Sequence, residues 1–158
     1  MRVGIIGPES TGKSSLARYL AKRYDGILVP EYAREYVERK GTTDLSFDEV
    51  CAIARHQIEE LSAIVSSDDS EEKLYVFDTE LIVTKVWFEY AFGRVPDWLE
   101  TAIRQYPMDV YLLTYPDIPW VPDPARSNGS DTIRKELFDR YETEIQRLDR
   151  PYYIIRHT

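Results

Sequence analysis

The sequence predicts an α/β fold in which a parallel β-sheet is covered by helices on both faces. Two observations support this prediction. Short apolar segments alternate with amphipathic segments along all 158 residues, as in sheets whose parallel strands are connected by helices. A glycine-rich motif at residues 7–14 lies between the first apolar segment and the first amphipathic one. We expect a single domain over residues 1–158 with a sizeable core.

Five short apolar segments are predicted as strands. They lie at residues 3–6, 26–30, 74–77, 109–113 and 152–155. Pro30 ends the second strand, because proline has no N–H group to donate to a neighbouring strand. The third strand, Leu74-Tyr75-Val76-Phe77, is nearly all apolar. This composition is typical of a strand buried on both faces, and the strand delivers Asp78 at its carboxyl end.

Six amphipathic segments are predicted as helices. They lie at residues 13–24, 31–39, 47–65, 81–92, 96–104 and 132–148. Ser46 and Glu49 have the spacing of a capping box at the start of the third helix. Gly41 and Gly93 are expected to end the second and fourth helices. In the fourth helix we expect four residues to face the core: Val83, Val86, Trp87 and Tyr90.

Composition and charge exclude several classes of protein. The net charge of −8 argues against a groove that follows a nucleic-acid backbone. One cysteine, Cys51, excludes an internal disulfide, and with two scattered histidines it makes no zinc site. No apolar run approaches the length that spans a membrane. Because Met1 leads directly into the first strand, we expect no signal peptide and a cytoplasmic protein.

Residues 7–14 read Gly-Pro-Glu-Ser-Thr-Gly-Lys-Ser, a complete phosphate-loop motif. Gly7 and Gly12 let the backbone curl so that N–H groups point at a β-phosphate, and the following helix adds its partial positive charge. Lys13, expected to be exposed, would reach the β- and γ-phosphates, and Ser14 would bind Mg²⁺. A turn that precedes a helix by chance is the alternative, but all motif positions match. We expect ATP to contact Gly7, Pro8, Glu9, Ser10, Thr11, Gly12, Lys13, Ser14 and Ser15.

Asp78 is predicted to hold Mg²⁺ together with Ser14, because a carboxylate at the end of a buried strand commonly has this role in phosphate-loop enzymes. The alternative is that Asp78 caps the helix that begins near Glu80, and the two roles are compatible. Asp78 is followed by Thr79, not by the glutamate that activates water in many ATPases. An Asn-Lys-x-Asp run for guanine is also missing. These absences favour a small ATP-dependent kinase.

A kinase needs an acceptor site, and residues 30–36 follow the second strand at the edge where ligands bind in open α/β sheets. Glu31 would bind sugar hydroxyls or accept the proton of the attacking one, a role for which Asp78 is also a candidate. Tyr32 would stack on a ring, and Arg34 would bind phosphate. The alternative is a surface helix with ordinary charge pairs. The expected acceptor contacts are Glu31, Tyr32, Arg34, Asp78, Thr79, Trp120 and Asp123.

Residues 114–131 form a segment with four prolines that is too irregular for regular secondary structure. Arg126 within it and Arg134 after it are predicted to close as a lid over the phosphates and to stabilise the transferred group. For Arg134 the alternative is a solvated position on a helix. Trp120 would line a base pocket or attach the loop to the domain.

Four motifs together resemble the ribosylnicotinamide kinase domain of NadR-type NAD-salvage proteins. They are GPESTGKS at 7–14, PEYAREY at 30–36, Asp78-Thr79, and Tyr111-Leu112-Leu113 followed by PDIPW at 116–120. The resemblance covers nearly the whole chain in the right order. It does not extend to a His-x-Gly-His nucleotidyltransferase region. The run after Trp120 keeps Asp123 and Arg126 in altered surroundings.

The resemblance implies a phosphate-loop fold with a five-stranded parallel sheet, in which the phosphate-loop strand lies beside the strand that carries Asp78. It also implies that ATP and Mg²⁺ phosphorylate the 5′-hydroxyl of nicotinamide riboside, giving nicotinamide mononucleotide. Two alternatives remain open: a kinase of another nucleoside or nucleotide, and a non-catalytic switch that binds ATP. The expected partner is a small-molecule nucleoside, without nucleic acid or membrane.

Overall fold

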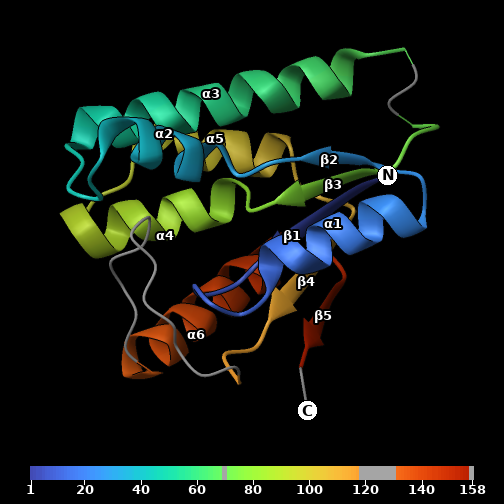
Figure 1. Ribbon diagram of the computed structural model, residues 1–158. Coiled ribbons are helices and arrows are strands. Elements are labelled where there is room, and N and C mark those ends of the chain that lie inside the picture. The colour runs from blue at the N-terminus through green and yellow to red at the C-terminus, as the bar shows by residue number, and fades with distance from the viewer. Residues whose placement is uncertain (69–70, 118–130, 157–158) are drawn as a thin grey trace.

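The computed structural model describes residues 1–68, 71–117 and 131–156. Five parallel strands form one sheet in the order β2-β3-β1-β4-β5 (Figure 1). The strands are β1 (Arg2–Ile6), β2 (Ile27–Val29), β3 (Tyr75–Asp78), β4 (Val110–Thr114) and β5 (Tyr152–Ile155). The predicted parallel α/β sheet is confirmed, and β1 does lie beside β3.

The helices lie where the sequence predicts them. They are α1 (Lys13–Arg23), α2 (Tyr32–Lys40), α3 (Phe47–Ser66), α4 (Leu81–Phe92), α5 (Asp97–Gln105) and α6 (Asp131–Leu148). Ser46 caps α3 through the predicted capping box with Glu49. Gly41 and Gly93 end α2 and α4 with φ angles of 81° and 69°, which glycine adopts without steric cost.

Two hydrophobic cores lie on opposite faces of the sheet, because successive side chains of a strand point in opposite directions. On one face, Ile5 of β1 and Val76 of β3 pack with Ala17 and Ala21 of α1. On the other, Ile6 belongs to the larger core beneath α3, α4 and α6 (Figure 1). Both faces of β1 and β3 are therefore buried, as their apolar sequences require.

The predicted core face of α4 is only partly correct. Val86 is fully buried, but Tyr90 is 39% exposed, and Val83 and Trp87 are half-buried. The fully buried residues also include Ile82 and Phe88 on other sides of the helix. The reason is that α4 packs against α3, α5 and α6 at once, so no single stripe faces the interior. A helix with so many apolar residues does not reveal its buried side by periodicity alone.

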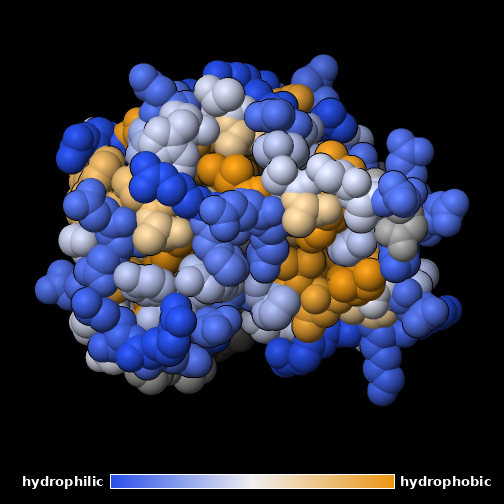
Figure 2. Space-filling view, turned by 90° about the horizontal axis from the view of Figure 1, so that it is seen from above, coloured by the Kyte–Doolittle hydropathy of each residue, from blue (hydrophilic) through white to orange (hydrophobic). Residues whose placement is uncertain are grey.

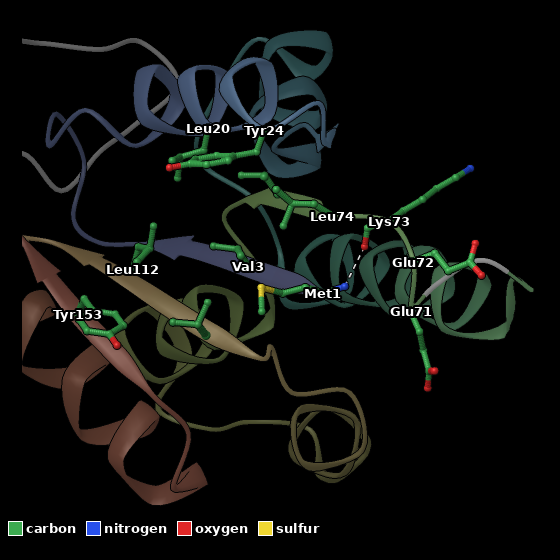
Figure 3. Close-up of a pocket in the computed structure, with 12 residues that line it drawn as sticks. Met1, Val3, Leu20, Tyr24, Glu71, Glu72, Lys73, Leu74, Leu112 and Tyr153 are labelled. Atoms are coloured by element: carbon green, nitrogen blue, oxygen red, sulfur yellow. Dashed lines mark hydrogen bonds between the residues drawn. The ribbon is translucent and has the colours of Figure 1, made fainter.

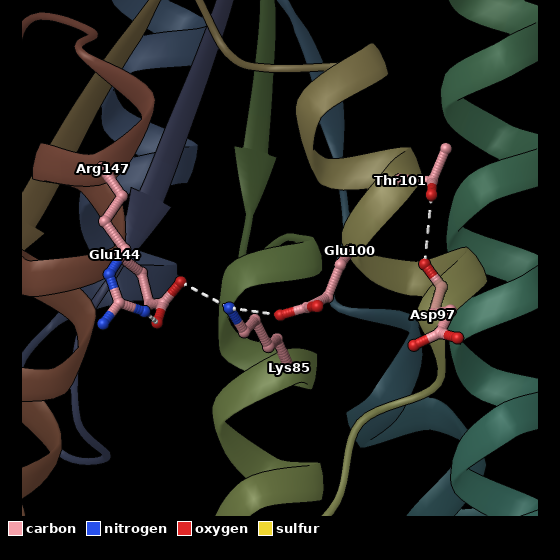
Figure 4. A network of polar contacts seen from close by, with 6 residues as sticks. All are labelled: Lys85, Asp97, Glu100, Thr101, Glu144 and Arg147. Atoms are coloured by element: carbon pink, nitrogen blue, oxygen red, sulfur yellow. Dashed lines mark hydrogen bonds and ion pairs between the residues drawn. The ribbon is translucent and has the colours of Figure 1, made fainter.

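Lys85 of α4 forms ion pairs with residues of α5 and α6 (Figure 4). Its Nζ lies 2.8 Å from Oε1 of Glu100 on α5 and 2.8 Å from Oε2 of Glu144 on α6. Arg147 donates to the other oxygen of Glu144 at 2.8 Å. Burial favours the neutral amine, but the hydrogen bonds to Glu100 and Glu144 outweigh it and raise the pKa of Lys85. The lysine therefore stays charged within this network.

A groove of about 550 Å³ opens on the α1 side of the sheet (Figure 3). Leu20 and Tyr24 of α1 line it together with Leu112 and Tyr153 of the strands. Met1 and residues 71–74 also line it, which places it toward the amino ends of the strands. Ligands of open α/β sheets bind at the carboxyl ends, so this groove is not the predicted site.

The outer surface is mostly polar in the view from above, with apolar side chains gathered in separate patches (Figure 2). Within the described ranges, none of the helices combines the length and the apolar character that crossing a membrane requires.

Candidate nucleotide and acceptor site

The phosphate loop runs from Gly7 to Ser14 between β1 and α1. Gly12 has a φ of 83°, and a Cβ added at Gly7 would collide with the Thr114 side chain and lie 2.8 Å from its carbonyl oxygen. Gly7 therefore has no room for a side chain, and Gly12 adopts a conformation that favours glycine. No side chain among the described residues caps α1 at Gly12. The first N–H groups of this helix are thus suited to bind an anion.

Lys13 is buried, not exposed as expected, with 7% of its surface accessible. The loop folds over its side chain, and Nζ donates to the carbonyl oxygen of Pro8 at 2.8 Å. Thr11 Oγ1 donates to the same carbonyl at 2.6 Å and lies 2.5 Å from Oγ1 of Thr114. These contacts fix the loop against the end of β4. Thr114, predicted as the first residue of the lid segment, is instead the last residue of β4 and contacts the phosphate loop.

Ser14 and Asp78 lie together at the start of α1 and the end of β3. Ser14 Oγ donates to Asp78 Oδ2 at 2.6 Å, because Asp78 pairs with Ile5 in the strand beside the phosphate loop. A hydroxyl and a carboxylate are oxygen ligands that suit Mg²⁺. The described residues hold no cluster of three or more His, Cys, Asp or Glu side chains that could bind a metal ion. A cation here would therefore need phosphate oxygens and water as further ligands.

Glu31 follows β2 at the same edge of the sheet, since β2 pairs with β3. It is 6% exposed and accepts a hydrogen bond from Thr79 Oγ1 at 2.6 Å. Arg34 lies farther out, with its Nε 3.6 Å from Glu31 Oε1 and its guanidinium 3.8 Å from Glu38. The structure thus brings Glu31 and Thr79 together, whereas Arg34 makes the helix charge pairs that were the alternative to phosphate binding.

Tyr32 stacks on a side chain of the protein itself. Its ring centroid lies 3.6 Å from that of His56 on α3, with 13° between the planes. Tyr32 also lines a small cleft with Pro30, Gln57 and Thr79, among others. This contact of His56 could not be predicted from the sequence, because it depends on how α2 and α3 pack together. One face of the Tyr32 ring is therefore already covered by His56.

Arg134 is 2% exposed and lies against the phosphate loop. Its guanidinium donates to the carbonyl oxygens of Glu9 at 3.4 Å and Ser10 at 3.3 Å, and to Oδ1 of Asp131 at 2.9 Å. The alternative of a solvated helix residue is therefore wrong. Arg134 reaches the loop because α6 packs on β4 beside β1. The position puts a cation next to the place where phosphates would bind.

The remaining predicted site residues divide into two groups. Ser15 is exposed on α1. Three others, Trp120, Asp123 and Arg126, lie outside the described residues. Most of the predicted lid at 114–131 also lies outside them. Their roles remain predictions.

Glu80, not Asp78, caps α4, so the capping role considered for Asp78 is wrong. Glu80 Oε1 accepts a hydrogen bond from the N–H of Ile82 at 2.7 Å, and only 3% of Glu80 is exposed. Burial raises the pKa of Glu80 to about 7, against the effect of the backbone hydrogen bonds from Ile82 and Leu81. This buried acid was not recognised in the sequence, where it follows Asp78-Thr79 as an ordinary first-turn glutamate.

The sequence matches a family model described as AAA domain over residues 2–158. The chain belongs to this family. It is also 31% identical over 138 residues to the trifunctional NAD biosynthesis/regulator protein NadR of Escherichia coli strain K12. That alignment covers 85% of the chain but 33% of NadR, so the chain spans about a third of the length of this curated relative.

Solved structures agree with the sequence match. A NadR protein in complex with NR superposes with a TM-score of 0.73 at 25% identity, covering 97% of this chain and 42% of that one. A NadR structure with NAD and AMP-PNP gives 0.70 at 27% identity, with 97% and 43% covered. Thymidylate kinase from Ehrlichia chaffeensis gives 0.71 at 15% identity, with 100% and 87% covered, which shows the fold alone.

These findings confirm the resemblance to NadR-type proteins and the phosphate-loop fold with a five-stranded parallel sheet. The family match and the similarity to NadR also support the prediction of an ATP-dependent kinase.

Proposed function

We propose that this chain transfers the γ-phosphoryl group of ATP to the 5′-hydroxyl of nicotinamide riboside, giving nicotinamide mononucleotide. The observation that carries the proposal is the meeting of two polar pairs at one edge of the sheet. Ser14 and Asp78 lie 2.6 Å apart beside the phosphate loop, and Thr79 and Glu31 lie 2.6 Å apart at the end of the next strand. Similarity to NadR, including a structure with NR bound, supports nicotinamide riboside as the acceptor.

The phosphate loop and two cations would hold the triphosphate. Lys13 and Arg134 donate hydrogen bonds to backbone carbonyl groups of the loop. Phosphate oxygens would replace these carbonyl acceptors when ATP binds. Ser14 and Asp78 would hold Mg²⁺, which neutralises charge on the β- and γ-phosphates when bound. Arg126 would add a further cation from the lid segment.

We assign Glu31 to the acceptor hydroxyl and Asp78 to the metal. Asp78 is already hydrogen-bonded to Ser14 at the start of α1, whereas Glu31 lies buried one strand farther from the phosphate loop. A carboxylate in that position can accept the proton of the attacking hydroxyl or orient it toward the γ-phosphate. Tyr32, Trp120 and Asp123 would then contact the nucleoside around it.

Steady-state ADP release with a panel of nucleosides tests the proposal. Nicotinamide riboside should stimulate multiple turnovers in the presence of Mg²⁺, with nicotinamide mononucleotide as the product. Glu31→Gln should lower kcat by roughly 10²–10⁴-fold, the usual contribution of a general base, with little change in the KM for ATP. Glu35→Gln, an exposed carboxylate on the same helix, is the matched control.

Two outcomes would contradict the proposal in different ways. Turnover that prefers another nucleoside would make the chain a kinase of that compound. ATP binding with no acceptor-dependent turnover would favour a switch.

A further inference from the structure

Thr79 has an unusual backbone conformation for its residue type. Its φ of 76° lies in the left-handed region, where a β-branched side chain is a genuine outlier. The residue is 7% exposed and is held at two points. Its N–H donates to the carbonyl oxygen of Ile5 at 2.9 Å, and its hydroxyl donates to Oε2 of Glu31 at 2.6 Å.

Asp78 and Thr79, the last residue of β3 and the first residue after it, bond to different partners. In an extended strand, successive side chains lie on opposite faces of the sheet. Here the chain bends directly after Asp78, while the bond from Thr79 to Ile5 keeps it attached to β1. Asp78 accepts a hydrogen bond from Ser14, and the hydroxyl of Thr79 donates to Glu31.

A turn that required only a positive φ would be made at lower cost by glycine. Threonine brings a hydroxyl to this position, and that hydroxyl is bonded to the buried carboxylate of Glu31. Because a carboxylate is planar, the bond from Thr79 to Oε2, together with Arg34 Nε at 3.6 Å from Oε1, sets the direction in which Oε1 can accept a proton. The strained backbone thus has a consequence beyond the turn itself.

We infer that Thr79 is a positioning residue that orients Glu31 toward the acceptor hydroxyl. This inference rests on the proposed function, in which Glu31 serves the acceptor. The sequence analysis placed Thr79 in contact with the substrate. In the present assignment it acts through Glu31 instead, so its loss lowers kcat and leaves ATP binding unchanged.

Three variants separate orientation from packing. Thr79→Val keeps the β-branched shape and removes the hydroxyl, Thr79→Ser keeps the hydroxyl, and Glu31→Gln removes the carboxylate. Loss of a group that orients a metal ligand typically costs about 10–100-fold, and by analogy we expect a fall of the same order in kcat for Thr79→Val, which loses the group that orients a catalytic carboxylate. Thr79→Ser should restore most of the activity. The KM for ATP should stay near that of the parent in both.

The double variant Thr79→Val/Glu31→Gln decides whether the two residues act as one unit. Its kcat should be no lower than that of Glu31→Gln alone, because Thr79 has nothing left to orient. The inference would be overturned if the fall in kcat of the double variant equalled the product of the two single falls. It would also be overturned if Thr79→Val kept the kcat of the parent. The proposed function is tested separately, because it fails if the parent does not phosphorylate nicotinamide riboside. The same single and double variants are then compared with the nucleoside that the parent accepts.

Crystal structures of the parent and the two Thr79 variants give a readout that needs no activity. The Glu31 carboxylate should keep its place in Thr79→Ser and change its orientation in Thr79→Val. An unchanged carboxylate in Thr79→Val would overturn the inference even for a protein without turnover.

Discussion

Replacing Glu80 by glutamine should stabilise the protein at alkaline pH and leave it unchanged in acid. Glu80 is 3% exposed and accepts a hydrogen bond from the N–H of Ile82 at the start of α4. Glutamine has nearly the same shape and keeps a carbonyl oxygen for this bond. The substitution therefore removes the buried charge and retains the helix cap.

The sign and size of the effect follow from the pKa of Glu80. Burial raises it from 4.5 in the unfolded chain to about 7 in the folded protein. Between these values the folded protein binds more protons, so stability is lost as pH rises through this window. Each pKa unit corresponds to about 1.4 kcal/mol, so the ionised carboxylate costs about 3 kcal/mol above pH 7. Below pH 4.5 both states are protonated and the cost disappears.

Urea unfolding of the parent and Glu80→Gln at several pH values between 4.5 and 8, with EDTA and without nucleotide, measures this difference. At pH 8 the variant should be more stable by up to about 3 kcal/mol, and the two curves should meet near pH 4.5. Comparing the two proteins at each pH removes the contribution of every other titrating group. A difference that does not change with pH, or a parent that is the more stable protein at pH 8, would refute the reasoning.

Three further predictions concern other parts of the molecule. Lys13→Met should abolish ATP-dependent turnover because the loop loses its buried cation, and circular dichroism should show an intact fold. Asp78→Asn should raise the Mg²⁺ concentration needed for half-maximal activity, since an amide is a weaker ligand than a carboxylate; an unchanged Mg²⁺ titration would contradict the metal role. Lys85→Met should lower the free energy of unfolding by about 1.5–3 kcal/mol, because Glu144 loses one charged partner but keeps Arg147, and Glu100 is 40% exposed. The exposed control Lys135→Met, which pairs with Asp139, should cost about 0–1 kcal/mol.

The features that were predicted correctly from the sequence depend on local patterns. The phosphate loop needs particular residues at fixed spacing, and the capping box of Ser46 and Glu49 needs only a separation of three. The meeting of Ser14 and Asp78 follows from two strands of one parallel sheet, whose carboxyl ends lie at the same edge. Each of these predictions used either neighbouring residues or a general rule of parallel sheets.

The features that were missed depend on which helices pack together. His56 reaches Tyr32 only because α3 packs beside α2. The burial of Lys13 and Glu80 arises in the same way, since each lies at a helix start that the rest of the chain covers. No periodicity in a single sequence encodes such neighbours. Buried polar residues are therefore where sequence reasoning is weakest in this protein.

The strand order converts positions along the chain into an order across the proposed active site. Read from β2 to β4, the strand ends present Glu31, then Asp78 and Thr79, then the phosphate loop, then Thr114. Neighbouring strands lie about 4.8 Å apart, so the end of β2 is roughly 10 Å from the end of β1. That separation leaves room for a γ-phosphoryl group and an acceptor hydroxyl between the loop and Glu31. In-line transfer needs the attacking and leaving oxygens on opposite sides of phosphorus. An acceptor held at Glu31 and a triphosphate held at the loop would meet this requirement with Asp78, and its cation, between them.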